Sequence, residues 1–187
     1  MGPFQSRWFI LFVLSVFTFF VFVAPAEATQ ISGTISSTLT ITDDSEFVGD
    51  VTCVVPLNTN TPGPTPCIAF GKSKKPISLR LNGHTMSGGF VPPAGCSVPG
   101  EPGFGVGILV AGIVDADIEI EGPGLVQGFQ RWGIFLLSSS QVTIKNVTAD
   151  HNCWSGIQTI GLSDSKLEKN VFTSNAGGSN GAFCGGT

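Results

Sequence analysis

Short runs in which apolar and polar residues alternate cover most of the chain beyond its N-terminal segment. Ile77, Leu79 and Leu81 alternate with polar positions, and a longer alternating run over 31–41 predicts one continuous strand near the start. Alternation with a period of two is typical of β-strands that bury one face. No window after the N-terminal segment has the 3.6-residue apolar period of an amphipathic helix. The pattern therefore predicts an all-β protein.

The segment 133–175 repeats its own pattern after 23 residues (132 to 155). Corresponding pairs are Trp132 and Ser155, Gly133 and Gly156, Ile144 and Leu167, Ala149 and Phe172, and Asn152 and Asn175. A fixed period in the twenties is typical of stacked coils, each of which buries its inner face only against its neighbours. We therefore expect at least two stacked coils in this segment.

An earlier pair of coils is expected from the same layout at a longer spacing. Ile118 and Ile120 follow Leu79 and Leu81 by 39 residues (79 to 118). The excess over one coil is a segment rich in Pro and Gly near 91–105. A second insertion of this kind lies near 56–66, and its prolines predict that it does not pair into a sheet.

The N-terminal segment predicts export. Arg7 precedes a 16-residue uncharged run over 8–23, and Ala26-Glu27-Ala28 has the small-x-small form of a cleavage site. A membrane-spanning helix needs about 20 apolar residues, so the run is short for one. We expect residues 1–28 to be a signal peptide and residues 29–187 to form the mature domain, which would be secreted or periplasmic. An uncleaved membrane anchor is the alternative.

Export makes disulfides the expected state of the cysteines, which are Cys53, Cys67, Cys96, Cys153 and Cys184. Cys53 and Cys67 bracket the first proline-rich insertion, so we expect them to be bonded to each other. Cys153 and Cys184 each precede a glycine at nearly the same place in successive coils, and strands about 4.8 Å apart are within reach of a disulfide. This leaves Cys96 unpaired, although a bond between Cys67 and Cys96 would also be compatible with the sequence.

The composition narrows the class of partner. The net charge is −4, and charged residues make up 12 % of the chain. An acidic surface does not attract nucleic acid or anionic membranes, so neither is an expected partner. The basic cluster Lys72-Ser73-Lys74-Lys75 is too short to reverse this conclusion and is interpreted as a solvated turn.

The order of these elements resembles a known family. The run 77–88 (ISLRLNGHTMSG), the later Val106-Gly107-Ile108, the strand into Gly128-Phe129-Gln130 and the Gly-Ile coils that end in Asn are similar to the secreted right-handed parallel β-helix proteins of the pectate-lyase-like superfold. The resemblance covers roughly 50–187. It implies three strands per coil and right-handed winding, and it implies further coils and a cap that this sequence does not show.

The sharpest chemical candidate is a row of acidic residues at alternating positions, namely Asp115, Asp117, Glu119 and Glu121. A row with this period shares one face of a strand, and neighbours about 6.5 Å apart could hold Ca²⁺ or act as acid and base on a sugar. The 39-residue alignment places Glu119 beside Arg80 of the preceding coil, and Glu121 falls beside Lys145 of the next coil, which explains both as cross-strand ion pairs. The first two aspartates have no such partner and remain candidates.

Other residues have simpler explanations. Asn152 and Asn175 are expected to form a structural ladder at the corner of successive coils. Arg131 is interpreted as a satisfied surface residue, and His84 and His151 as exposed turn residues too dispersed to bind copper.

We therefore expect an exported right-handed parallel β-helix with few coils and no evident C-terminal cap. Its expected role is a structural or polysaccharide-binding scaffold with no identifiable complete catalytic site, no metal site and no cofactor. The alternative is a polysaccharide lyase, hydrolase or epimerase of the pectate-lyase-like type whose active part is weak or missing. A repeat tether of the adhesin kind would require many more coils.

Overall fold

The computed structural model describes residues 27–56, 63–89 and 104–175, and all regular structure within them is β. The strands are β1 (Thr29–Ile35), β2 (Leu39–Ile41), β3 (Ser45–Cys53), β4 (Pro64–Phe70), β5 (Ile77–Arg80), β6 (Thr85–Ser87), β7 (Phe104–Ala111), β8 (Ile118–Glu121), β9 (Leu125–Gln127), β10 (Trp132–Leu137), β11 (Val142–Lys145), β12 (Thr148–Asp150), β13 (Ser155–Ile160), β14 (Lys166–Glu168) and β15 (Val171–Thr173). The prediction of an all-β protein is confirmed. None of these ranges contains a helix that could cross a membrane, and the proposed leader lies almost entirely outside them.

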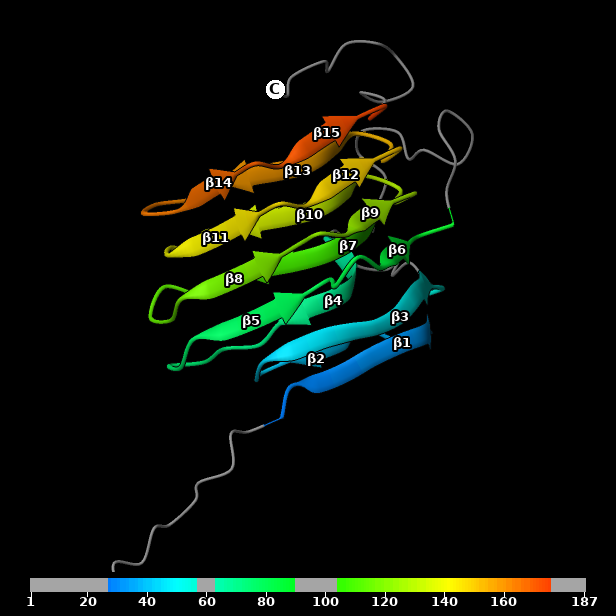
Figure 1. Cartoon of the computed structure of the whole chain (residues 1–187). Helices are drawn as coiled ribbons and strands as arrows, with labels where there is room; N and C mark the ends of the chain where they lie inside the picture. Colours follow the sequence, from blue (N-terminus) through cyan, green and yellow to red (C-terminus); the bar gives the residue numbers. More distant parts are fainter. Residues whose placement is uncertain (1–26, 57–62, 90–103, 176–187) are drawn as a thin grey trace, which may run out of the picture.

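The strands form two sheets in which the neighbours run parallel (Figure 1). The first sheet has the order β14-β11-β8-β5-β3-β6-β9-β12-β15, with β1 beside β3, and the second has the order β13-β10-β7-β4-β2. The long strand β3 pairs with β5 near its start and with β6 near its end. Above β3 the first sheet therefore consists of two columns, which we call the first column (β5, β8, β11, β14) and the second column (β6, β9, β12, β15).

From β4 onward the chain visits the second sheet, the first column and the second column in turn (Figure 1). We call one such passage a coil. The inner positions form apolar ladders that run up the stack, for example Ile68, Ile108 and Ile134, which are fully buried. A coil that lies between two others therefore has its inner face covered by the coils above and below it.

The register confirms the later repeat and corrects the earlier one. Ile144 pairs with Leu167, as predicted. Leu79, however, pairs with Ile120, not with Ile118, so the spacing between these strands is 41 residues (79 to 120). The predicted alignment matched Gly83, the third residue after β5, with Gly122, the first residue after β8, and this displaced the strands by two residues. Both spacings place Leu79 opposite a buried isoleucine of β8, so the apolar alternation alone does not distinguish the two registers.

Two further expectations near the N-terminus are wrong in detail. The alternating run over 31–41 is not one strand, because β1 and β2 belong to different sheets. Pro64 and Pro66, which the sequence predicted to stay out of a sheet, begin β4 and pair with β7. The prolines are tolerated there because β2 pairs only with the later part of β4, so no strand on that side needs their missing N–H groups. Thr38 donates a hydrogen bond to the carbonyl of Pro66 (2.8 Å).

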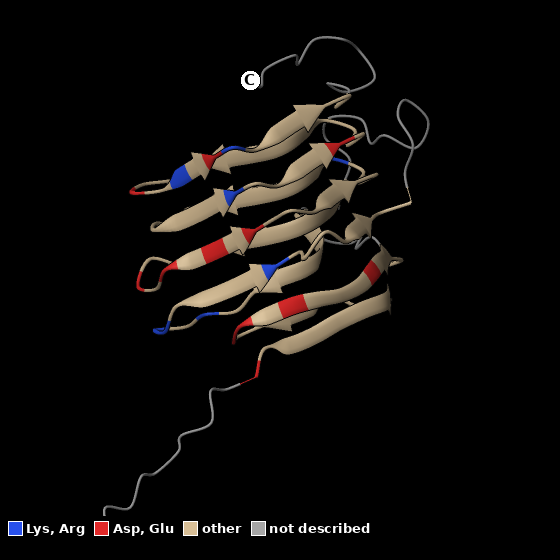
Figure 2. Cartoon of the chain, in the orientation of Figure 1, with Lys and Arg blue, Asp and Glu red and all other residues tan. Residues whose placement is uncertain are grey.

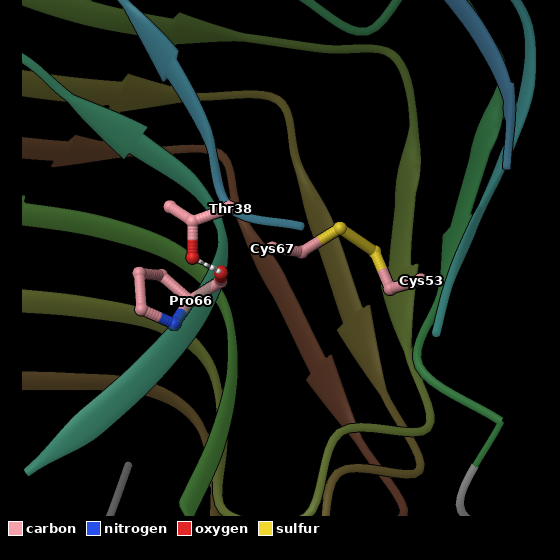
Figure 3. Close-up of a disulfide and its surroundings, with 4 residues drawn as sticks. All are labelled: Thr38, Cys53, Pro66 and Cys67. Carbon is pink, nitrogen blue, oxygen red and sulfur yellow. Dashed lines mark hydrogen bonds between the residues drawn. A yellow bond between two sulfur atoms is a disulfide. The ribbon is translucent and has the colours of Figure 1, made fainter. Parts of the chain in front are cut away.

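The predicted bond between Cys53 and Cys67 is present (Figure 3). It joins the end of β3 to the middle of β4, with a Cα–Cα distance of 5.9 Å, and closes the connection between the two sheets. Cys153 is buried and disulfide-bonded. Cys96 and Cys184 lie outside the described residues, so the proposed Cys153–Cys184 pairing stays a prediction.

Candidate functional site

The outer face of the first column carries a row of alternating charge (Figure 2). Cross-strand neighbours in this row, from β3 to β14, are Glu46, Arg80, Glu121, Lys145 and Glu168. Directly opposed residues of opposite charge stabilise a sheet by a few tenths of a kcal/mol, up to about 1 kcal/mol per pair. The row therefore supports the stacking of the first column.

A hollow of about 360 Å³ lies beside this row, on the outer face of β8, β11 and β14. We call it the polar groove, and its lining residues are Asp117, Ile118, Glu119, Gln141, Thr143, Asp164 and Lys166. Each of three successive coils contributes two outward polar residues, because outward positions alternate with buried ones such as Ile118 and Val142. The groove thus crosses the strands along the axis of the stack.

Lys145 holds the acidic side of the groove in place. Its Nζ lies 2.6 Å from Oε1 of Glu119 and 3.4 Å from Oε1 of Glu121. The hydrogen bond to Glu119 is the main reason why the pKa of Lys145 lies above its ordinary value; desolvation opposes this rise, and the bond to Glu121 supports it. The prediction that Glu121 lies beside Lys145 is confirmed.

The predicted pairing of Glu119 with Arg80 is wrong. Arg80 lies opposite Glu121 in the sheet, and its closest described carboxylate is Glu46, at 3.6 Å. The observed register differs from the predicted one by two residues. Glu119 therefore lies opposite Ser78, one outward position before Arg80 in β5. Glu119 is nevertheless ion-paired, since the long side chain of Lys145 reaches it diagonally.

Asp117 and Asp115 occupy different surroundings, although both point outward as predicted. Asp117 lines the polar groove and makes no ion pair with any residue the structure describes. Asp115 lies earlier, in the turn before β8, and lines a separate hollow of about 450 Å³ together with Lys72 and Lys74. The structure therefore does not bring these two aspartates to one site.

The groove does not contain a recognisable metal cage. Across residues 27–56, 63–89 and 104–175, the structure shows no group of three or more His, Cys, Asp and Glu side chains close enough to share an ion. What the groove offers is a set of hydrogen-bonding groups: carboxylates, an amide, a hydroxyl and an ammonium. Such a set binds hydroxyl-rich ligands through direct and water-mediated hydrogen bonds.

The two histidines each lie beside an aspartate. Nδ1 of His151 is 2.7 Å from Oδ2 of Asp150, and Nδ1 of His84 is 3.6 Å from Oδ1 of Asp50. Burial alone would raise the pKa of Asp150, but the hydrogen bonds from His151 and Thr173 outweigh it and leave that pKa below its ordinary value. His151 is exposed as predicted, whereas His84 is half-buried.

Arg131 is not a surface residue, contrary to expectation. It is 7 % exposed, and its guanidinium lies 4.3 Å from the ring centre of Trp154 and 5.9 Å from that of Trp132. The two indoles meet edge to face, with their ring centres 5.9 Å apart. A planar guanidinium stacks well on aromatic rings. This cluster is on the second sheet, away from the polar groove.

The asparagine ladder is confirmed. The side-chain oxygen of Asn175 accepts hydrogen bonds from the backbone N–H and the side-chain amide of Asn152 (3.0 and 3.1 Å). Asn152 in turn donates to the carbonyl of Val126 and accepts from the N–H of Phe129 (3.2 and 3.1 Å). Both asparagines therefore satisfy backbone groups at the corners of successive coils and are structural.

Sequence reasoning missed four residues of the groove, namely Gln141, Thr143, Asp164 and Lys166. The signal was available in the 23-residue repeat, because Asp164 and Lys166 follow Gln141 and Thr143 by one period (141 to 164). Asp117 and Glu119 precede Gln141 and Thr143 by 24 residues (117 to 141), one more than the period, so the alignment of all three pairs needs the strand register that the structure shows.

Comparison with known proteins finds no match to this chain among protein-family models, curated proteins or solved structures.

Proposed function

We propose that this protein is an exported right-handed parallel β-helix of the pectate-lyase-like kind, and that it binds polysaccharide in the polar groove as a scaffold. The cyclic visiting order of the three strand columns and the parallel pairing between coils support the β-helix. The leader-like 1–28 segment and the Cys53–Cys67 bond support export.

One observation carries the binding proposal: the groove extends across three coils and repeats a pair of outward polar side chains in each. Successive coils are about 4.8 Å apart, close to the length of one sugar in an extended glycan. A glycan that lies along the stack would therefore meet equivalent hydrogen-bonding groups at each successive sugar. Gln141 and Thr143 occupy the middle coil and would contact the central sugar.

The charge of the groove favours a neutral glycan over an acidic one. Asp117, Glu119 and Asp164 face a single lysine of the lining, Lys166. The net negative potential disfavours the approach of a polyuronate. Neutral polysaccharides are therefore the ligand class that the groove favours.

A second candidate function is glycoside hydrolysis, and one observation favours it. Asp117 and Asp164 line the same groove from coils two steps apart, which corresponds to about 9.6 Å between their strands. Inverting hydrolases hold their two carboxyl groups about 6.5–9.5 Å apart, so that water fits beside the sugar. Scaffold and hydrolase therefore share the groove and differ in whether product forms.

The test is glycan binding by affinity electrophoresis and calorimetry over a panel of neutral glycans, pectate and alginate. Gln141→Ala combined with Thr143→Ala should weaken binding to the neutral ligand by about tenfold, the loss of two ordinary hydrogen bonds. The matched control is Thr148→Ala, which removes an outward threonine from the second column and should leave binding unchanged. Failure of every neutral glycan to bind, or a double variant that binds normally, would overturn the proposal.

The hydrolase alternative is examined with the same panel. Release of reducing ends that is lost by about 10²-fold or more in Asp117→Asn would identify an enzyme. Binding without product supports the scaffold. A crystal structure would check the handedness of the winding independently of either result.

A further inference from the structure

The last described coil exposes the face that every other coil buries. Ile144 in β11 and Ala149 in β12 are fully buried, whereas their partners one coil later, Leu167 and Phe172, are 48 % and 38 % exposed. Both belong to strands at the end of the first sheet. Apolar side chains and a sheet edge are therefore exposed together at one place, which is a typical template for pairing with another strand.

The backbone of Leu167 is oriented for such pairing. The carbonyl of Glu168 accepts a hydrogen bond from the N–H of Asn146, so Glu168 directs its polar groups toward β11 (2.9 Å). Successive residues of a strand direct these groups to opposite sides. Leu167 therefore directs its N–H and C=O toward the exposed edge, away from β11.

The charges around Leu167 identify what fits this edge. Lys166 and Glu168 flank Leu167, and both point outward and are exposed. If two copies of β14 pair antiparallel with Leu167 opposite Leu167, each Lys166 lies opposite Glu168 of the second copy. Opposite charges directly across an antiparallel pair are favourable. The edge is therefore complementary to itself.

The other end of the stack does not fit in the same way. β1 has no charged residue, and its pairing with β3 is irregular between Ile31 and Gly33. Polar composition and irregular pairing are features that prevent edge-to-edge association. Contact between β14 of one copy and β1 of the next would leave Lys166 and Glu168 without partners.

We propose that two copies of this protein associate through β14, antiparallel, about a two-fold axis at Leu167. Leu167 donates its N–H to, and accepts a hydrogen bond from, Leu167 of the second copy. The two first sheets then form one continuous sheet, and Leu167 of each last coil is covered at the junction.

Light scattering and sedimentation over a range of concentrations test the association. In the dimer, Lys166→Glu puts two negative charges opposite each other at both symmetry-related contacts, and Glu168→Lys puts two positive charges there. Each variant should therefore weaken the dimer by roughly tenfold or more. The double change Lys166→Glu with Glu168→Lys restores both pairs between the copies and should restore the dimer relative to Glu168→Lys alone, which shares with it the loss of the contact between Lys145 and Glu168 within the chain. The matched control is Lys169→Glu, a charge reversal just outside β14.

Cross-linking tests the position of the axis. Leu167→Cys should form a disulfide between copies under mild oxidation, because directly opposed residues in an antiparallel pair have Cα atoms about 5.5 Å apart. Val171→Cys, which is equally exposed but lies away from the axis, should not. A monomer at all concentrations, or a dimer that neither single charge reversal weakens, would overturn the proposal. So would protected β14 amides in a monomer, because they would mean that the edge is covered within its own chain.

Discussion

Two consecutive coils of this protein have the same pattern and different surroundings. The coil of β10, β11 and β12 is matched residue for residue by the coil of β13, β14 and β15. Ile144 is fully buried in the first, and its partner Leu167 is 48 % exposed in the second. The difference shows that the burial of an inner residue depends on whether a further coil covers it. Two coils with the same sequence pattern can therefore contribute differently to the free energy of unfolding.

The two corner asparagines, Asn152 and Asn175, show the same contrast in their burial and their hydrogen bonds. Asn152 is fully buried and bonds both to the coil before it and to Asn175 in the coil after it. Asn175 is half-buried, and the bonds the structure shows for it run to the preceding coil, including one to the carbonyl of Ala149 (3.0 Å). The inner coil thus has contacts on both sides where the last coil has them on one.

The largest expected effect is a difference between matched core truncations. Ile144→Ala should lower the free energy of unfolding by about 2–5 kcal/mol, because it leaves a cavity in a fully buried ladder. Leu167→Ala should cost about 1 kcal/mol or less, since much of that side chain is already in water. Urea unfolding at a protein concentration low enough to keep the chain monomeric measures both.

Ile144→Val is the control for this comparison and should cost about 0.5–1.5 kcal/mol, less than Ile144→Ala, because it removes a single methyl group from the buried ladder. Equal losses for the two alanine variants would mean that the last coil is covered as fully as the inner one. That result would contradict the contrast between the two coils.

A smaller difference is expected between the two asparagines. Asn152→Ala removes the acceptor for the buried N–H of Phe129 and should cost about 1–3 kcal/mol. Asn175→Ala removes bonds at a half-buried corner and should cost about 0.5–1.5 kcal/mol. The measurement is again urea unfolding, and Asn170→Ala, which removes a similar corner bond to Val147, provides a comparison. A cost for Asn175 greater than that for Asn152 would reverse the proposed order.

The smallest expected effect depends on pH. Asp150 accepts a hydrogen bond from Thr173 of the last coil (2.9 Å), and its pKa is lowered in the folded protein. A lowered pKa means that the stabilisation is complete above the pKa of the unfolded chain and is lost as the pH falls through the folded value. Asp150→Asn should therefore destabilise the protein by less than about 1 kcal/mol at neutral pH and by nothing in strong acid.

Stability curves of the wild type and the Asn variant, compared from pH 7 down to pH 2, test this prediction. A constant difference over that range would show that the carboxylate charge is not responsible. Thr173→Val should reproduce part of the effect at neutral pH if the contact between coils carries it.

The later coils could be predicted from the sequence because their turns have equal lengths. The 23-residue alignment of Trp132 with Ser155 and of Ile144 with Leu167 matches the register of the strands. The earlier alignment failed because Gly83 lies three residues after the end of β5 and Gly122 one residue after the end of β8, so matching these glycines displaced the strands by one outward position. β3 was also missed, although Phe47, Val51 and Cys53 are buried at alternating positions in it.

The candidate site could be predicted only in part. Period-two alternation was enough to place Asp117 and Glu119 on the outer face, because it needs no knowledge of neighbouring strands. The rest of the groove comes from strands 23 and more residues away, and the reach of the Lys145 side chain decides which carboxylate it binds. Arg131 was misassigned because its burial against Trp154 depends on contacts between successive coils that alternation cannot show.

The charge row described on the first column also bears on how such a chain can lengthen by duplication. The buried pattern recurs with every coil, but the outer row alternates in sign and recurs only with every second coil, as Glu121, Lys145 and Glu168 show. Copying one coil in the gene would set Lys145 beside its own copy, and like charges directly opposite are unfavourable. Copying two coils preserves the alternation throughout. Growth in pairs is therefore the route this surface permits without a compensating substitution.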